Sequence, residues 1–318
     1  MKKHLFLIGL MVCSMATIAQ TEGADKPESW YFKLGGSYFI QTAATEFPTV
    51  SGALPNTDVY AADGTTLVSR EANHGSFGEG FRTGLTAGYR FSPRLGVEVG
   101  FNYFNGKSKT MVETTNRLVA AGPVFATGKA EGKIEAYDVA PALVLFLGEV
   151  KRFEPYTKVG VIVPVHGNLT IETTRAYTTP GGVINSYTKD VVKPNPTVGF
   201  LAALGTSYKL GTHVAVFAEL EYRNFTVHGK TKETEIYTEN GVDKLYTSTS
   251  FRPDASYSAS HVDYVKQLNS GSNNPLFNPN TSTADPKDTT RPNDAMNDIS
   301  SFVGISGLGL TFGLKYSL

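Results

Sequence analysis

Eight stretches of the chain alternate apolar residues with polar or small ones over about ten positions each, and this pattern constrains the fold most. The last stretch is the clearest: Gly307, Gly309, Thr311, Gly313, Lys315 and Ser317 alternate with Leu308, Leu310, Phe312, Leu314, Tyr316 and Leu318. A period of two is typical of a β-strand whose two faces meet different surroundings. Strands of soluble proteins are usually about five or six residues long, whereas a tilted membrane-crossing strand needs about 9–11. The pattern therefore favours transmembrane strands.

The connections between the stretches alternate in length. Short turns lie at 92–94, 148–152 and 210–212, and long loops span roughly 42–77, 110–130, 173–194 and 230–300. Short turns on one side and long loops on the other are typical of outer-membrane barrels, in which the long loops are extracellular. We therefore predict an all-β fold: an eight-stranded antiparallel transmembrane up-and-down β-barrel over residues 20–318, with its long loops outside the cell.

Three of the long loops carry hairpin signals between residues that favour strands. These are Asp63-Gly64, Pro180-Gly181-Gly182 and Asn240-Gly241, and such pairs predict tight turns. We expect the strands to continue beyond the membrane as hairpins. The fourth loop is expected to hold a short helix over 260–268, with Ser260 as its cap and Asp263 at the third position, and an irregular segment over 270–298 that is rich in Asn, Pro, Asp and Thr.

The charged residues of the predicted strands fall on the glycine-rich face. A soluble lipocalin-like barrel would have the opposite polarity, with its apolar face around a cavity. A narrow lumen that buries charges requires them to be paired, so we predict a polar plug, in which Arg90 and Glu98 lie within reach of each other across one short turn. By parity the lumen holds Lys33, Arg82, Arg90, Glu98, Asp138, Lys158, Glu219, Glu221, Arg223 and Lys315.

The first nineteen residues are typical of a secretory signal peptide. A cationic start is followed by an apolar run and by small residues before a cleavage site between Ala19 and Gln20. The single cysteine, Cys13, lies inside this segment. A lipoprotein reading fails because Met11 and Val12 stand where small residues are required. The mature chain is therefore expected to contain no disulfide.

The C-terminus carries the most specific motif, with Thr311, Gly313, Tyr316 and Leu318 at spacings typical of a barrel-assembly signal. Over residues 29–318 the chain resembles the small outer-membrane β-barrel proteins of Gram-negative bacteria, of the OmpA-transmembrane-domain, OmpX or OmpW type. It departs from them at Leu318, where the family usually ends in Phe. The resemblance implies outer-membrane lipid and lipopolysaccharide around the barrel, periplasmic chaperones and the barrel-assembly machinery as partners, an extracellular ligand for the loops, and a monomer.

The sequence offers little chemistry. Lys and Arg total 29 and Asp and Glu total 29, so the basic excess of a nucleic-acid binder is absent. The histidines of the mature chain show no metal-ligand spacing, and we expect no cofactor, metal or catalytic site. Two function classes remain open: a structural or surface-interaction barrel, and a narrow channel or carrier for a small or apolar solute as in OmpW-like proteins. A lipid-modifying enzyme with a Ser-His-acid set at the rim is a weaker alternative.

Overall fold

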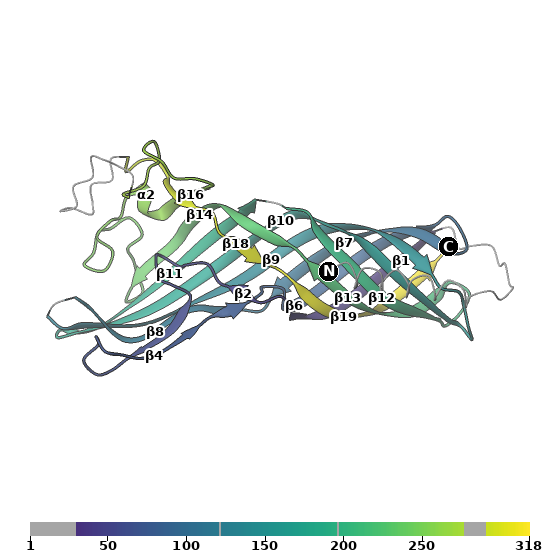
Figure 1. The fold of residues 1–318 in the computed structure, drawn as a ribbon, viewed down its shortest axis with the longest axis horizontal. Helices are drawn as coiled ribbons and strands as arrows, with labels where there is room; N and C mark the ends of the chain where they lie inside the picture. The colour runs from purple at the N-terminus through teal and green to yellow at the C-terminus, as the bar shows by residue number, and fades with distance from the viewer. Residues whose placement is uncertain (1–29, 121, 196, 277–290) are drawn as a thin grey trace, which may run out of the picture.

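The protein is an elongated all-β molecule, shown here as a computed structural model (Figure 1). The structure describes residues 30–120, 122–195, 197–276 and 291–318. The predicted signal peptide, with its cleavage site at Ala19 and Gln20, lies outside the described residues. Within the described part of the chain, no helix is long and apolar enough to cross a membrane.

Eight antiparallel strands close into a ring, which confirms the predicted barrel. Each strand pairs with the next and the last pairs with the first. In ring order the strands are β1 (Trp30–Gln41), β6 (Gly80–Arg90), β7 (Leu95–Gly106), β9 (Val124–Phe146), β10 (Phe153–Thr179), β12 (Gly199–Lys209), β13 (Val214–Asn224) and β19 (Gly307–Ser317). Short connections join β6 to β7, β9 to β10 and β12 to β13 at one end, where the C-terminus also lies (Figure 1).

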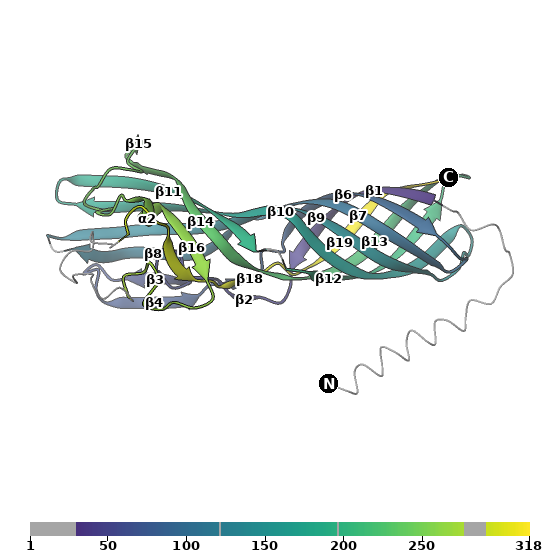
Figure 2. The same cartoon turned by 90° about the horizontal axis from the view of Figure 1, so that it is seen from above.

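Beyond the other end of the ring, the chain builds a second β-structure, which we call the extension. It contains the N-terminal part of β9 and the C-terminal part of β10, which run on from the barrel (Figure 2). Its main sheet has the order β4-β3-β8-β9-β10-β11-β14-β16-β17. The added elements are β2 (Thr45–Glu46), β3 (Asn56–Tyr60), β4 (Leu67–Ala72), β5 (His74–Gly75), β8 (Lys109–Ala120), β11 (Gly182–Asn195), β14 (Thr226–Glu239), β15 (Val242–Asp243), α2 (Tyr257–Ser260), β16 (His261–Val265), β17 (Met296–Ile299) and β18 (Phe302–Gly304).

The extension agrees with the three predicted hairpin turns and corrects other details. The turns at 61–66, 180–181 and 240–241 connect paired strands. The segment 110–130, expected as a loop, is a further hairpin of β8 and β9. The helix expected over 260–268 is wrong: α2 is one turn capped by Ser256, and Val262 and Tyr264 lie in β16. That strand pairs with β14 on one edge and with β17 on the other, so sheet pairing outweighs the local helix signal. Of the segment 270–298, residues 277–290 lie outside the described residues, and the described part is not wholly irregular, because β17 begins at Met296.

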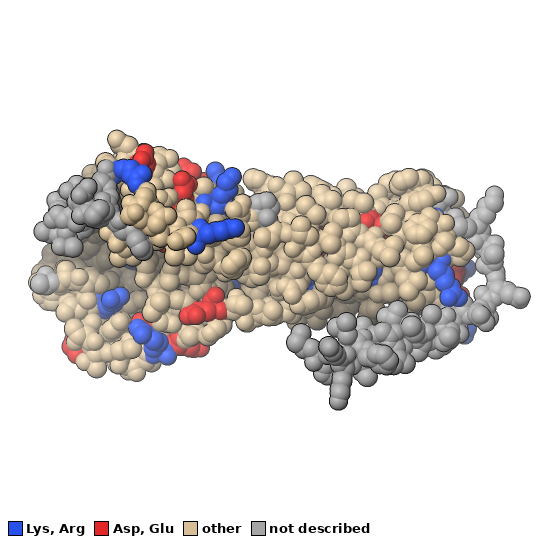
Figure 3. Space-filling view, turned by 45° about the horizontal axis from the view of Figure 1, so that its top comes forward, with Lys and Arg blue, Asp and Glu red and all other residues tan. Residues whose placement is uncertain are grey.

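The barrel and the extension have opposite polarity. On the barrel, apolar side chains face outward, as with Leu34, Leu85 and Leu204, which are 58%, 61% and 62% exposed. In Figure 3 the visible barrel side carries few charged residues, which gather over the extension and at the short-turn end. Inside the extension, apolar side chains such as Phe77, Met111 and Ile134 form a buried core. The extension is therefore a folded unit with its own hydrophobic interior.

A β-bulge in β10 marks the boundary between the two parts. The register with β9 shifts between Pro164 and His166. Before the bulge even-numbered residues such as Ile162 face inward, and after it odd-numbered residues such as Leu169 do. His166, which shares the parity of the inward-facing Lys158, is therefore exposed. A bulge adds one residue to a strand and changes which side chains face the interior, and nothing in the alternation pattern of β10 predicts it.

Candidate functional site

The upper part of the barrel lumen, next to the extension, is crossed by two linked ion pairs. The Arg82 guanidinium donates to both carboxylate oxygens of Glu221, at 2.8 and 3.0 Å. Arg223 Nη2 lies 2.6 Å from Asp138 Oδ1, and the Asn102 amide donates to the same oxygen at 2.8 Å. All five side chains are buried. Such bidentate and charge-assisted bonds hold both partners in fixed orientations.

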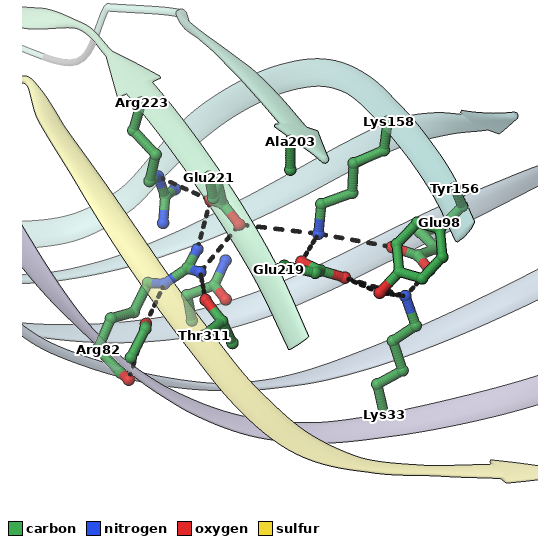
Figure 4. A network of polar contacts seen from close by, with 12 residues as sticks. Lys33, Arg82, Glu98, Tyr156, Lys158, Ala203, Glu219, Glu221, Arg223 and Thr311 are labelled. Carbon is green, nitrogen blue, oxygen red and sulfur yellow. Dashed lines mark hydrogen bonds and ion pairs between the residues drawn. The ribbon is translucent and has the colours of Figure 1, made fainter. Parts of the chain in front are cut away.

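A second cluster fills the middle of the lumen (Figure 4). Glu219 accepts from Lys158 at 2.6 Å, from Lys33 at 3.1 Å and from the Tyr156 hydroxyl at 2.7 Å. Lys33 Nζ also lies 2.5 Å from Glu98 Oε1, which accepts a further bond from the Tyr31 hydroxyl at 3.0 Å. Lys158 is 3.7 Å from Glu221, so the two clusters join. Together four cations meet four anions, which offsets the cost of burying each charge.

Arg90 and Lys315 form a separate group at the short-turn end. The register leaves Arg90 and Glu98 as diagonal neighbours across the turn, within the predicted reach, but they form no ion pair, because Arg90 Nη1 lies 2.6 Å from Glu154. Lys315 Nζ lies 3.6 Å from the other oxygen of Glu154. In the observed register Glu98 is opposite Gly88, while Arg90 is opposite Gly96. Glu98 therefore lies two residues further from the short turn than the position opposite Arg90, and there it pairs with Lys33.

Besides Asn102, the predicted set of lumen residues omits Tyr31, Glu154 and Tyr156. Glu154 and Tyr156 share the parity of Lys158, so a longer predicted strand would have included them. Tyr31 shares the parity of Lys33, but an aromatic side chain on that face does not by itself indicate a hydrogen bond to a buried carboxylate. Glycines make room for both rings. A Cβ atom at Gly88 would lie 2.2 Å from the Tyr31 ring, and one at Gly205 would lie 2.6 Å from the Tyr156 ring.

All ten predicted lumen residues thus face the interior, and eight of them join one network. The free space among the charged groups amounts to about 40 Å³, which is room for only a few water molecules. Two apolar clusters border the network: Tyr31, Val144, Phe146 and Tyr156 toward the short-turn end, and Ala140, Ile162 and Leu201 on the wall formed by β9, β10 and β12. The arrangement closes the lumen.

A larger cavity of about 480 Å³ lies above the network, where the barrel meets the extension. Arg82, Asp138 and Arg223 form its floor, and most of its remaining lining is apolar, with Phe39, Phe104 and Ile134 among the side chains. Two buried polar atoms of the lining, Asn168 Oδ1 and Arg223 Nε, have no hydrogen-bond partner among the described residues. An unpaired buried polar atom is costly, so a water molecule or ligand group is expected at each.

The wall of this cavity is interrupted beside the bulge. β10 pairs with β12 up to Ile162 and with β11 from Leu169 onward. Among the described residues, 163–168 and 193–198 form no ladder pairs with each other, and residues from both sides of this interval line the cavity. The backbone ladder is therefore interrupted next to the cavity.

The C-terminal motif lies on β19 and its end. Thr311 and Gly313 face the lumen, where Thr311 accepts a bond from Arg82 at 3.3 Å, whereas Tyr316 and Leu318 are exposed, 48% and 65%. A side chain at Gly313 would meet the Leu34 carbonyl oxygen at 2.1 Å, so glycine is required there by packing. Among the described residues, no group of three or more His, Cys, Asp or Glu side chains could hold a metal ion.

A family model agrees with this architecture. The model of the outer membrane protein beta-barrel domain matches residues 5–258, more than half of the chain. Among solved structures, the chain is similar to the outer membrane protein OprG from Pseudomonas aeruginosa, with 12% identity over 92% of this chain and 96% of that one and a TM-score of 0.39. It is also similar to Ail, the attachment invasion locus protein of Yersinia pestis, with 10% identity over 91% and 97% and a TM-score of 0.28. No curated relative matches. With its closed ring of eight strands and its matching domain model, the chain belongs to the outer membrane β-barrel family.

Proposed function

We propose that the barrel is a closed anchor in the outer membrane and that the extension is the working part, which displays a rigid surface outside the cell. One observation carries the proposal: the lumen is filled by a paired charge network, while the extension has its own apolar core. A filled lumen does not favour solute passage, and a chain that only anchored itself would not need a folded extension. The role requires no catalytic step.

The proposal includes a topology and a set of partners. Export would use a signal peptide cleaved between Ala19 and Gln20 in a Gram-negative cell. Periplasmic chaperones and the barrel-assembly machinery would receive the chain, with Tyr316 and Leu318 available on the outer face of β19. The short turns would then face the periplasm and the extension would face outward, with lipid and lipopolysaccharide around a monomeric barrel.

Single-channel conductance of the refolded full chain in a planar bilayer tests the anchor proposal. Wild-type protein should show little or no steady conductance. Glu219→Gln with Glu221→Gln removes two of the four anions of the network and should raise conductance, whereas Glu235→Gln, on an exposed pair with Lys189 in the extension, should not. A large steady conductance in the unmodified protein would contradict the proposal.

A second candidate is a carrier for a small, largely apolar solute. The 480 Å³ cavity beside the interrupted ladder favours it, because a ligand held there would lie above the charge network and need not cross it. Filling the cavity with Ala136→Phe should then abolish retention of a small apolar probe, such as a detergent-sized alkyl amine oxide, while the lumen stays closed. Retention unchanged by this substitution would exclude the carrier.

A further inference from the structure

A trough runs along β9 on the inner face of the extension. Three rows of paired residues cross it: Val112, Ala130 and Thr173, then Thr114, Gly128 and Arg175, then Arg117, Ala126 and Tyr177. In each row the middle residue, on β9, is small, while its neighbours on β8 and β10 are larger. Because side chains on one face of a sheet stand side by side, the small row leaves a channel between two walls. The resulting cavity is about 280 Å³.

The trough is closed below and on one side by well-packed groups. At its lower end the next glycine of the row, Gly132, is covered by Met111 Sδ and the Phe77 ring, which a Cβ atom there would meet at 2.7 and 2.9 Å. The loop from Val50 to Ala53 forms a further wall. It is a tight turn, closed by Val50–Ala53 backbone bonds of 3.1 and 2.9 Å, with Ser51 and Gly52 at positive φ.

The chemistry of the walls is cationic and hydroxylic. Arg117 and Arg175 line the trough from opposite sides of β9. Among the described residues, neither guanidinium makes a hydrogen bond or an ion pair. Of the charges nearby, Lys129 pairs with Glu131 at 2.8 Å, and Asp58, whose carboxylate also interacts electrostatically with Arg117, pairs with Arg70 at 2.7 Å. Ser51, Thr114 and Thr173 add hydroxyl groups to the lining.

We propose that this trough binds an acidic sugar, as one residue of a larger surface glycan. Arg117 pairs with Ala126 and Arg175 pairs with Gly128, so their Cα atoms lie two strand spacings and two residues apart, about 12 Å. The stem of Arg175 lies over Gly128, and both guanidiniums can approach one anionic group held between them. Guanidinium groups bind carboxylate and sulfate through paired hydrogen bonds. The hydroxyl side chains suit the ring hydroxyls of a sugar, and the volume lies just below the roughly 300–1,000 Å³ of drug-sized pockets, which suits a single ring.

The inference rests on the proposed display function and names the chemistry that the extension would recognise. Its test uses the refolded full chain in lipid nanodiscs and two probes that differ at one position: methyl glucuronoside, with a carboxylate, and methyl glucoside, with a hydroxymethyl group. Binding is measured by NMR titration. The glucuronoside should bind at least about tenfold more tightly, since a charge-assisted bond contributes about 1.5–3 kcal/mol. A sulfated glucoside, as a third arm, identifies the preferred acid group.

Matched variants locate the site. Arg117→Gln and Arg175→Gln should each weaken glucuronoside binding about tenfold, and Arg175→Lys should restore part of the loss. Lys133→Gln, on the outer face of the same strand and paired with Glu135, removes the same charge outside the trough and should change nothing. Far-ultraviolet circular dichroism and electrophoretic mobility check that each variant is folded.

Several results would overturn the proposal. The first two are equal binding of the two methyl glycosides and no binding of either probe to the wild type at millimolar concentration. A third is a loss of affinity in Lys133→Gln equal to that in the arginine variants. The fourth is tighter binding of a blocked glutamate than of the glucuronoside, which would point to an acidic peptide. Conductance of the same preparation separates the two proposals. A closed lumen without sugar binding rejects the trough alone, whereas an open lumen rejects the anchor whatever the sugar result.

Discussion

At the scale of single residues, the lumen shows charges whose burial is tolerated because every one has a partner. Of the two acids in the upper ion pairs, Glu221 has more cationic neighbours. Arg82 donates to both its oxygens, and Arg223 and Lys158 each lie 3.7 Å from it. Removing one partner of a buried pair leaves an uncompensated charge, whereas replacing both by apolar groups of similar volume is often neutral. The cost of a substitution here depends on what remains.

Glu221→Gln should therefore destabilise the protein by about 3–5 kcal/mol, because Arg82 stays buried without its counter-charge. The double variant Arg82→Met with Glu221→Met should recover most of that loss. Urea titrations of folding in lipid vesicles measure both free energies of unfolding. If the double variant loses as much free energy of unfolding as Arg82→Met and Glu221→Met lose together when made singly, the two residues are not coupled.

At the scale of an element, each barrel strand presents one face to lipid and the other to the charge network. Leu204 stands at the middle of β12 on the outer face, opposite Leu220 of β13. Leu210 follows the same strand at the short turn and is also exposed. The cost of a charge on the lipid face depends on depth, so these two positions form a matched pair.

Leu204→Arg should lower the free energy of unfolding by about 2–4 kcal/mol, and Leu210→Arg by about 0–1 kcal/mol. Refolding titrations in vesicles give both values. Equal losses at the two positions would show that Leu204 does not lie near the middle of the bilayer.

The β3–β4 hairpin depends on a carboxylate in its turn. Asp63 accepts the backbone N–H groups of Thr65 and Thr66 at 3.0 and 2.9 Å, and the Thr66 hydroxyl at 2.5 Å. These bonds lower the pKa of Asp63 from 3.8 to about 2. A carboxyl group whose pKa is depressed in the folded state contributes its stability above its unfolded pKa and loses it as the pH falls through the folded one.

Hydrogen exchange of the β3–β4 amides should therefore show falling protection between about pH 4 and pH 2. The turn at Asn240 provides the control, because there an amide oxygen accepts from the Asn185 N–H at 2.9 Å and does not titrate. Asp63→Asn should remove the pH dependence of the first hairpin. Parallel loss of protection in both hairpins would indicate general acid unfolding instead.

At the scale of the whole molecule, the two ends differ in exposure to the outside of the cell. In the proposed topology Lys151 and Arg152, both exposed in a short turn, face the periplasm, and the exposed Lys266 lies in the extension. Trypsin added to intact cells should cut after Lys266 and leave the 151–152 turn intact until the outer membrane is permeabilised. Cleavage at 151–152 in intact cells without cleavage at Lys266 would reverse the assigned orientation.

The sequence predicts which face of a strand each side chain is on, but it does not predict contacts that depend on how the strands are paired. The face of every barrel strand and the inward placement of Lys33 or Glu219 follow from parity, because lipid and lumen impose opposite requirements on neighbouring residues. The partner of Arg90 does not follow, since it is Glu154 of β10, a strand that does not pair with β6. Likewise, β16 and β17 form only because β14 offers a free edge. The trough cannot be predicted either, because the small residues on β9 leave a cavity only when β8 and β10 pair on both sides of them in this register.

The continuity of β9 and β10 has a mechanical consequence. They are 23 and 27 residues long and remain paired on both sides of the bulge, so at about 3.3 Å per residue each extends roughly 75–90 Å. A load applied at the far tip is carried by this two-stranded ribbon directly into the barrel wall, without a flexible joint. Pulling would strain the ladder bonds in shear, along the strands, where many must break together. A force on the extension would therefore be transmitted through β9 and β10 to the barrel.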